Sequence, residues 1–236
     1  DGLRVKGYGV DDQFNVITTQ LVNIEIPLGK LHVAQETRNA TIEGAIRTGE
    51  VALAGTESEV LQSAPLFDAA GDAITATTLL SDVRKSVGGT PQFVTGETIS
   101  FTPRKGGADY EAIEFAITAS STAGDLAQFL GDSFGLDSSA SVAGDPFGPA
   151  GVNITTDGRI EVVGNAGTSQ SVEITPARFR QSQTGAGLSS LRSVDLDFES
   201  TREGIGESSV VTFPVFDSLG ERLLVRMHTV LESKSA

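Results

Sequence analysis

Cysteine is absent from the 236 residues, so the chain has neither a disulfide framework nor a thiolate metal site. Tryptophan is absent too, and aromatic residues make up only 6% of the sequence, which predicts a core with few large rings. Gly, Asp, Ser or Thr interrupts every apolar run before it is long enough to cross a bilayer. We expect a soluble, folded chain of one large β domain or two domains of ordinary size.

Basic residues are scarce, because 17 Lys and Arg stand against 31 Asp and Glu and leave a formal net charge of -14. A field of this sign repels nucleic-acid phosphates and anionic lipid headgroups. We therefore expect neither a nucleic-acid nor a membrane partner.

Ligand spacings typical of metal sites are also missing. His32 and His228 each lack a second histidine or a carboxylate at the spacing of a zinc site. Three acidic pairs lack the ligand spacing of a calcium loop and are interpreted as solvated turn or strand surface. These pairs are Asp11/Asp12, Glu57/Glu59 and Asp195/Asp197. We expect no bound metal, and we interpret His228 as a polar residue of an alternating strand.

Motifs for cofactor binding and nucleophilic catalysis are missing as well. The glycine groups Gly88-Gly89, Gly106-Gly107 and 204–206 match neither the dinucleotide-binding nor the P-loop pattern, so they are interpreted as turns. The serine pairs Ser120-Ser121 and Ser138-Ser139 lie in no nucleophile elbow. The sequence thus predicts no catalytic residue, no cofactor and no enzymatic activity.

Short runs rich in Val, Ile and Thr, separated by many of the 27 glycines, predict a mainly β chain with frequent turns. The predicted strands are 3–8, 15–17, 21–26, 41–46, 50–54, 97–103, 113–118, 151–155, 159–163, 170–174, 194–198, 208–216 and 223–231. Within 21–26, Val22, Ile24 and Ile26 share one face of the strand.

One helix is predicted from Thr122 to Phe134, because apolar residues recur there at helical spacing and Thr122 stands three residues before Asp125. A single helical turn is predicted within 78–83, capped by Thr78 or Ser81.

Four connections between strands are predicted as turns. Thr156-Asp157-Gly158 joins two alternating runs, a strong hairpin signal. The loop 217–220 joins the two longest predicted strands and has Gly220 where a left-handed residue is needed. Residues 104–107 form the third turn, between the strands 97–103 and 113–118. Residues 9–12 form the fourth turn, near the start of the chain.

Two distant segments together resemble the hook proteins of the bacterial flagellum. Residues 3–17 resemble the stretch V-x-G-Y-x-V-D-x-x-F-N-I-I of this family, and residues 26–29 resemble the I-P-L-G that follows it. Residues 212–220 are similar to the Y-D-S-L-G hairpin of the family, with Phe216 in place of the usual Tyr. Residues 121–130 with 154–174 more weakly resemble a helix-plus-hairpin insert of flagellins and some hook proteins. The motif residues are Gly7, Tyr8, Val10, Asp11, Phe14, Asn15, Pro27, Leu28, Gly29, Phe216, Asp217, Ser218, Leu219 and Gly220.

This resemblance implies two β-rich domains and a chain that lacks the family's terminal helices. Residues 1–45 and 195–236 would form a discontinuous inner domain, and 46–194 an inserted outer domain with the one short helix. The long end strands also favour this division on physical grounds, because each lacks local partners and needs the other.

The function that the resemblance implies is structural: a self-assembling subunit of the flagellar hook, a curved and flexible tube that transmits motor torque to the filament. It implies export through the flagellar secretion apparatus to the cell exterior. The implied partners are copies of the chain, the rod and hook-filament junction proteins and a hook cap. The alternatives are a distal rod protein of the basal body and a cell-surface adhesin or carbohydrate-binding β module, with a soluble hydrolase as a more distant one.

Overall fold

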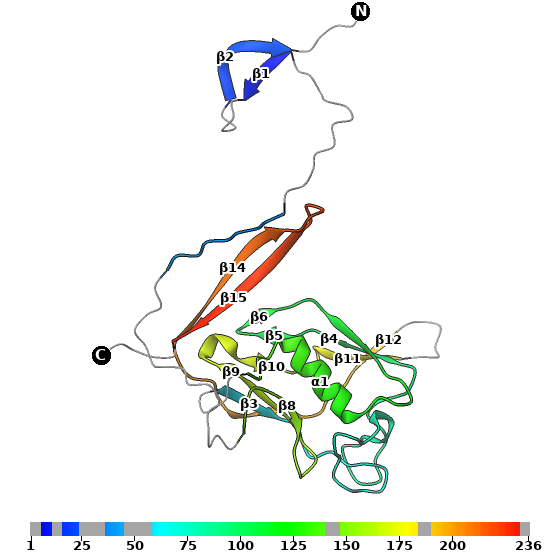
Figure 1. Cartoon of the computed structure of the whole chain (residues 1–236). Helices are drawn as coiled ribbons and strands as arrows, with labels where there is room; N and C mark the ends of the chain where they lie inside the picture. Colours follow the sequence, from blue (N-terminus) through cyan, green and yellow to red (C-terminus); the bar gives the residue numbers. More distant parts are fainter. Residues whose placement is uncertain are drawn as a thin grey trace, which may run out of the picture. The chain divides into compact units, whose positions relative to one another are not determined.

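The structure is a computed structural model that describes residues 6–10, 16–23, 36–44, 58–139, 147–183 and 190–231. These residues form fifteen β-strands, one α-helix and two 3-10 helices (Figure 1). The prediction of a mainly β fold with one short helix is confirmed. Contacts divide the chain into a small unit, Asp1–Ala40 with Pro214–Leu224, and a large unit, Thr41–Phe213 with Val225–Ala236.

One sheet of the large unit has the antiparallel order β13-β3-β9-β8. Its strands are β3 (Ser58–Gln62), β8 (Gly151–Ile154), β9 (Ile160–Ala166) and β13 (Glu199–Arg202). β8 and β9 form the predicted hairpin, with Ile154 opposite Ile160 and Gly158 in the turn at a φ of 77°. β9 is buried along most of its length because it lies between two strands and against the core.

A second sheet has the antiparallel order β12-β11-β4-β7. Its strands are β4 (Thr98–Phe101), β7 (Ile113–Ala116), β11 (Phe179–Gln183) and β12 (Ser190–Ser193). The predicted pairing of 97–103 with 113–118 is confirmed in β4 and β7. Their connection is more than a turn, because β5 (Arg104–Lys105) and β6 (Ala108–Asp109) form a small hairpin that β10 (Val172–Glu173) extends.

The α-helix α1 (Ala123–Phe134) is the predicted helix, with the predicted cap. The Thr122 hydroxyl accepts from the backbone N–H of Asp125, and the Asp125 carboxylate accepts in turn from the N–H of Thr122 at 2.8 Å. Gly135 ends the helix in the left-handed conformation. The apolar face of α1 lies in a core shared with both sheets, which contains Leu66, Ile74, Leu80, Phe93, Ile99, Phe101, Leu126, Leu130, Phe134, Ile160, Val162 and Phe179.

The predicted helical turn near residue 80 is the 3-10 helix Leu80–Asp82, but its predicted cap is wrong. Leu79 occupies the N-cap position and makes no side-chain capping bond. The Thr78 hydroxyl accepts from the N–H of Thr75 at 2.9 Å instead, in the turn that precedes the helix. A second 3-10 helix spans Thr168–Gln170.

Several predicted strand boundaries need correction. Residues 194–198 form no strand. Buried and exposed residues alternate there as in a strand, with Val194 and Leu196 buried. Asp197 has a φ of 52°, which interrupts an extended backbone. Residues 41–44 are irregular. The predicted strands 15–17 and 21–26 join in the single strand β2 (Val16–Asn23), while 24–26, 45–46 and 50–54 lie outside the described residues.

The two end segments form separate two-stranded sheets. β1 (Lys6–Val10) pairs with β2, and β14 (Ser208–Phe216) pairs with β15 (Arg222–Val230). β1 includes Gly9 and Val10, which were predicted as turn. β13 pairs with β3, although the predicted domain boundary at residue 195 separates them. The assignment of 1–45 and 195–236 to one domain stays a prediction.

We expect Gly158→Ala to lower the free energy of unfolding of the large unit by about 3 kcal/mol, because it adds steric overlap to backbone strain. A Cβ at this position would lie 2.5 Å from the Leu66 carbonyl oxygen and 2.9 Å from the Ile74 nitrogen. Gly88→Ala is the matched control: its φ is 72° but its Cβ would meet nothing within 4 Å, so about 1 kcal/mol of strain is expected. Urea unfolding of both variants measures the difference, and equal losses would contradict the steric argument.

Candidate functional site

The β14–β15 hairpin consists of two nine-residue strands, the longest described in the chain (Figure 1). It exposes apolar side chains along much of its length. Leu219 at its tip is 81% exposed. The other exposed large apolar residues of the hairpin are Val211, Phe216, Leu223, Leu224 and Val225. Exposed apolar groups at this density are typical of surfaces that other protein segments cover.

The tip of the hairpin is held by the side chain of Asp217. Its Oδ1 accepts hydrogen bonds from the backbone N–H groups of Leu219 and Glu221, both at 2.8 Å. The backbone closes the same turn, since Asp217 N donates to Glu221 O and Gly220 N donates to Asp217 O, both at 3.0 Å. Gly220 has a φ of 80°, as the predicted left-handed position requires. Ser218 and Leu219 are therefore presented outward on a fixed loop.

Residues 36–40 of the small unit run beside the end of β14 (Figure 1). Thr37 N donates to Phe216 O at 2.8 Å, and Phe216 N donates to the Thr37 hydroxyl at 2.9 Å. These two bonds engage the backbone N–H and C=O of Phe216, the motif residue at the end of β14. The residue remains 44% exposed. Sequence reasoning did not anticipate Thr37.

The β1–β2 hairpin carries the first motif. Gly7 lies opposite Val22 and Tyr8 opposite Leu21, and the register shifts between Tyr8 and Gly9, while Val10 ends the strand opposite Val16. Tyr8, Val16, Ile17, Leu21 and Val22 are all exposed. The remaining motif residues of this end, Asp11, Phe14, Asn15, Pro27, Leu28 and Gly29, lie outside the described residues.

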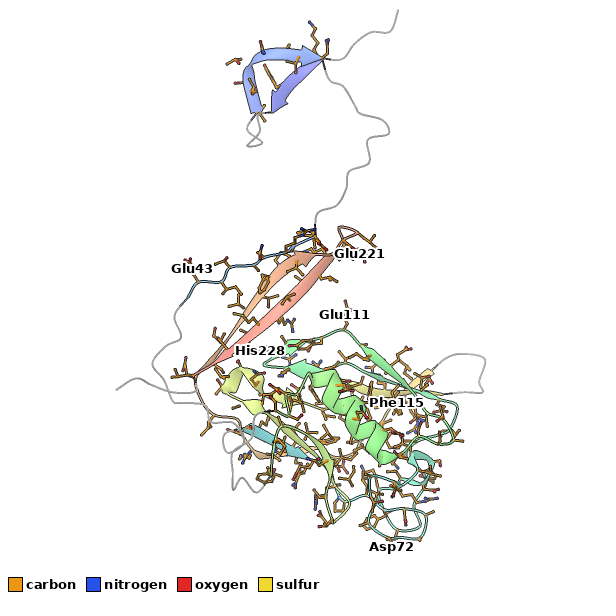
Figure 2. All side chains as sticks on the ribbon, viewed as in Figure 1. Glu43, Asp72, Glu111, Phe115, Glu221 and His228 are labelled. Carbon is orange, nitrogen blue, oxygen red and sulfur yellow. The ribbon has the colours of Figure 1, made fainter. Side chains whose placement is uncertain are left out.

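Near the base of β15, His228 (Figure 2) contacts Tyr110, and both residues belong to the large unit. The Tyr110 hydroxyl lies 3.3 Å from Nε2 of His228, and the guanidinium of Arg226 stacks 4.6 Å from the centre of the Tyr110 ring. Burial lowers the pKa of His228, and the positive charges of Lys105 and Arg226 lower it further. His228 is thus a half-buried strand residue with a side-chain partner rather than a solvated one. No motif predicted this contact.

Lys105 is a buried cation that ties β5 to the end of α1. Its Nζ donates to the carbonyl oxygens of Phe134 and Gly135 at 3.2 and 3.5 Å and to Oδ1 of Asn165 at 3.2 Å. Burial lowers the pKa of Lys105 to about 8. A lysine at this place satisfies backbone carbonyls that a helix end leaves unpaired.

The acidic pairs named above serve local structure where the structure describes them. Asp195 accepts from the N–H of Asp197 at 3.0 Å, and Asp197 pairs with Lys85 at 2.6 Å. Glu59 accepts from the N–H of Val172 at 2.6 Å, and burial raises the pKa of Glu59. Within the described ranges, no three His, Cys, Asp or Glu residues come together as a metal site, and no helix is long and apolar enough to span a membrane. His32, Asp11, Asp12 and Glu57 lie outside these ranges.

Comparison of the chain with protein-family models, with curated proteins and with solved structures finds no match. The hairpin surfaces and the motif residues are therefore the features of the chain that bear on its function.

We expect Asp217→Ala to open the tip of the β14–β15 hairpin, because two backbone N–H groups lose their acceptor at a typical net value of about 1 kcal/mol each. Hydrogen exchange of the Leu219 and Glu221 amides should then accelerate at least tenfold. Asp217→Asn keeps an acceptor oxygen and should exchange nearly as the original chain does. Ser218→Ala, at an exposed neighbour, is the second control. Unchanged exchange in Asp217→Ala would show that the backbone alone holds the turn.

The stability of the large unit should rise with pH between about 8 and 10.4. Lys105 has a folded-state pKa of about 8, whereas an unfolded lysine titrates near 10.4, so the unfolded chain binds more protons across this interval. We expect a gain of about 1 kcal/mol, after allowance for partial solvent screening. Lys105→Met removes this titration, so its free energy of unfolding should change less over the same interval. Parallel curves for the two proteins would contradict the assignment.

Proposed function

We propose that this chain is a structural subunit of the bacterial flagellar hook, which assembles with copies of itself into a curved, flexible tube outside the cell and transmits motor torque to the filament. The observation that carries the proposal is the β14–β15 hairpin, in which the Asp217–Gly220 motif forms a closed turn at the tip of a long ribbon with exposed apolar side chains. The sequence motif and the geometry of the turn thus agree at the same residues.

The distribution of apolar side chains supports a role in assembly. Both hairpins expose large apolar residues, whereas the large unit buries a core that contains four phenylalanines, with three more packed against it. An enzyme needs a concave site with converging polar groups, but an assembling subunit needs surfaces that neighbours cover. The exposed strands have this second property.

The charge and polarity of the surface suit a tube that bends. Neighbouring subunits must slide past one another during bending, which favours contacts of modest area, such as two-stranded hairpins offer, over large dry interfaces. A chain with a net charge of -14 repels its own copies at long range, so short-range contacts must hold the neighbours in place. Rod proteins, hook-filament junction proteins and a hook cap are the further partners that belong to this proposal.

Deletion of the encoding gene tests the proposal directly. We expect cells that lose hooks and filaments but retain basal bodies with complete rods in negative-stain images, and expression of the full-length gene should restore the hooks. A rod that ends early would favour the distal rod protein instead. Normal flagella together with reduced binding of cells to glycans would favour an adhesin and would overturn the proposal.

A further inference from the structure

The outer edge of β7 has no partner strand in the described part of the chain. β7 is the last strand of its sheet and pairs with β4. Beyond its end, Ile117 N donates to Glu97 O and Ile117 O accepts from Gly96 N, both at 2.8 Å. Alternate residues of an antiparallel strand face the same side, so the backbone groups of Glu114 and Ala116 point outward. They form an open ladder of donors and acceptors.

β7 lacks three of the usual protections of a sheet edge, although it is only four residues long and carries one charge. The sequence Ile-Glu-Phe-Ala contains neither proline nor lysine, and its register with β4 runs without a bulge. Its one charged residue is the exposed Glu114, which repels acidic strands but attracts basic ones.

A hollow of about 360 Å³ lies beside the edge, between β7 and α1. Its apolar floor consists of Phe115, labelled in Figure 2, and Phe129. The two ring centres lie 5.3 Å apart, and both residues are half-buried. Its other lining residues are Ser121, Asp125, Gln128 and Asp132. A side chain that projects from an added strand towards this hollow would cover both rings.

The rim of the hollow is acidic. Asp125 and Asp132 lie seven residues apart and therefore on one face of α1, and both are exposed. Asp125 uses one oxygen in the helix cap, whereas the Asp132 carboxylate contacts no cation among the described residues. Asp125 and Asp132 thus place negative charge on one face of the β7 edge, and Glu114 places it on the other. This charge favours a partner with basic side chains.

We propose that the β7 edge binds an extended protein segment with basic side chains on one face and apolar side chains on the other, which adds to β7 as a further strand. The backbone of the segment bonds to Glu114 and Ala116, its apolar side chains fill the hollow against Phe115 and Phe129, and its basic side chains lie opposite Glu114. Main-chain bonds supply affinity in strand addition, and side-chain pockets and charges supply specificity. This site is separate from the hairpin surfaces on which the proposed function depends.

The test uses the 236-residue chain and a fluorescein-labelled nine-residue peptide of alternating lysine and valine, with fluorescence anisotropy at about 0.15 M salt, where the long-range field is screened. Ala116→Pro removes an outward N–H without touching the bonds to β4, and we expect it to weaken binding at least tenfold. Glu114→Lys should weaken binding by a similar factor. Asp72→Lys makes the same change of charge at an exposed loop residue outside β7, so it should change binding less than twofold.

Two outcomes would overturn the proposal. Full binding by Ala116→Pro would exclude strand addition, and equal weakening by Glu114→Lys and Asp72→Lys would show that the peptide responds only to net charge. Circular dichroism and thermal unfolding check that each variant folds. If Ala116→Pro does not fold, a peptide with N-methylated valines removes the same backbone bonds from the other side. Undiminished binding of that peptide to the original chain would also exclude strand addition.

Discussion

The packing of the large unit depends on the ring of Phe101. This side chain is fully buried in β4 and meets three other rings edge-on: Phe134 at 5.3 Å, Phe179 at 5.8 Å and Phe129 at 6.4 Å. Two of these rings belong to α1 and one to β11, so the Phe101 ring contacts both the helix and a neighbouring strand of its own sheet. A chain without tryptophan has few such rings, and loss of a buried phenylalanine side chain typically costs about 3–5 kcal/mol.

The position of α1 in turn determines two features at its surface. Its C-terminal carbonyls lie where the ammonium group of Lys105 can reach them, and its outer face places Phe129 beside Phe115. The hollow next to β7 is therefore a consequence of the Phe101 contacts. A shift of the helix by one turn would separate the two rings and move both Asp125 and Asp132 away from the sheet edge.

Features with short-range causes were predictable from the sequence. The cap of α1, the turn at Gly158 and the turn after Phe216 each depend on bonds within about five residues, and each has a recognisable residue pattern. Residues 194–198 show the opposite case. Val194 and Leu196 are buried against the core and each makes a backbone bond to a neighbouring segment, but the five residues do not continue as a strand, which periodicity alone does not reveal.

The contacts of the candidate sites were not predictable, because they join residues far apart in the sequence. Tyr110 meets His228 across 118 positions, and Lys105 meets Asn165 across 60. A single lysine or tyrosine in a turn-rich segment carries no pattern that indicates burial. The free edge of β7 also becomes visible only when the strand order of the sheet is known.

The bonds at the tip of the β14–β15 hairpin all lie between Asp217 and Glu221. None of them involves a residue of β14 or β15, so the loop is closed by its own residues. If a load bends or twists the strands, the loop can keep all of its own hydrogen bonds. Leu219 would then keep the same local shape towards whatever it touches while the ribbon beneath it deforms.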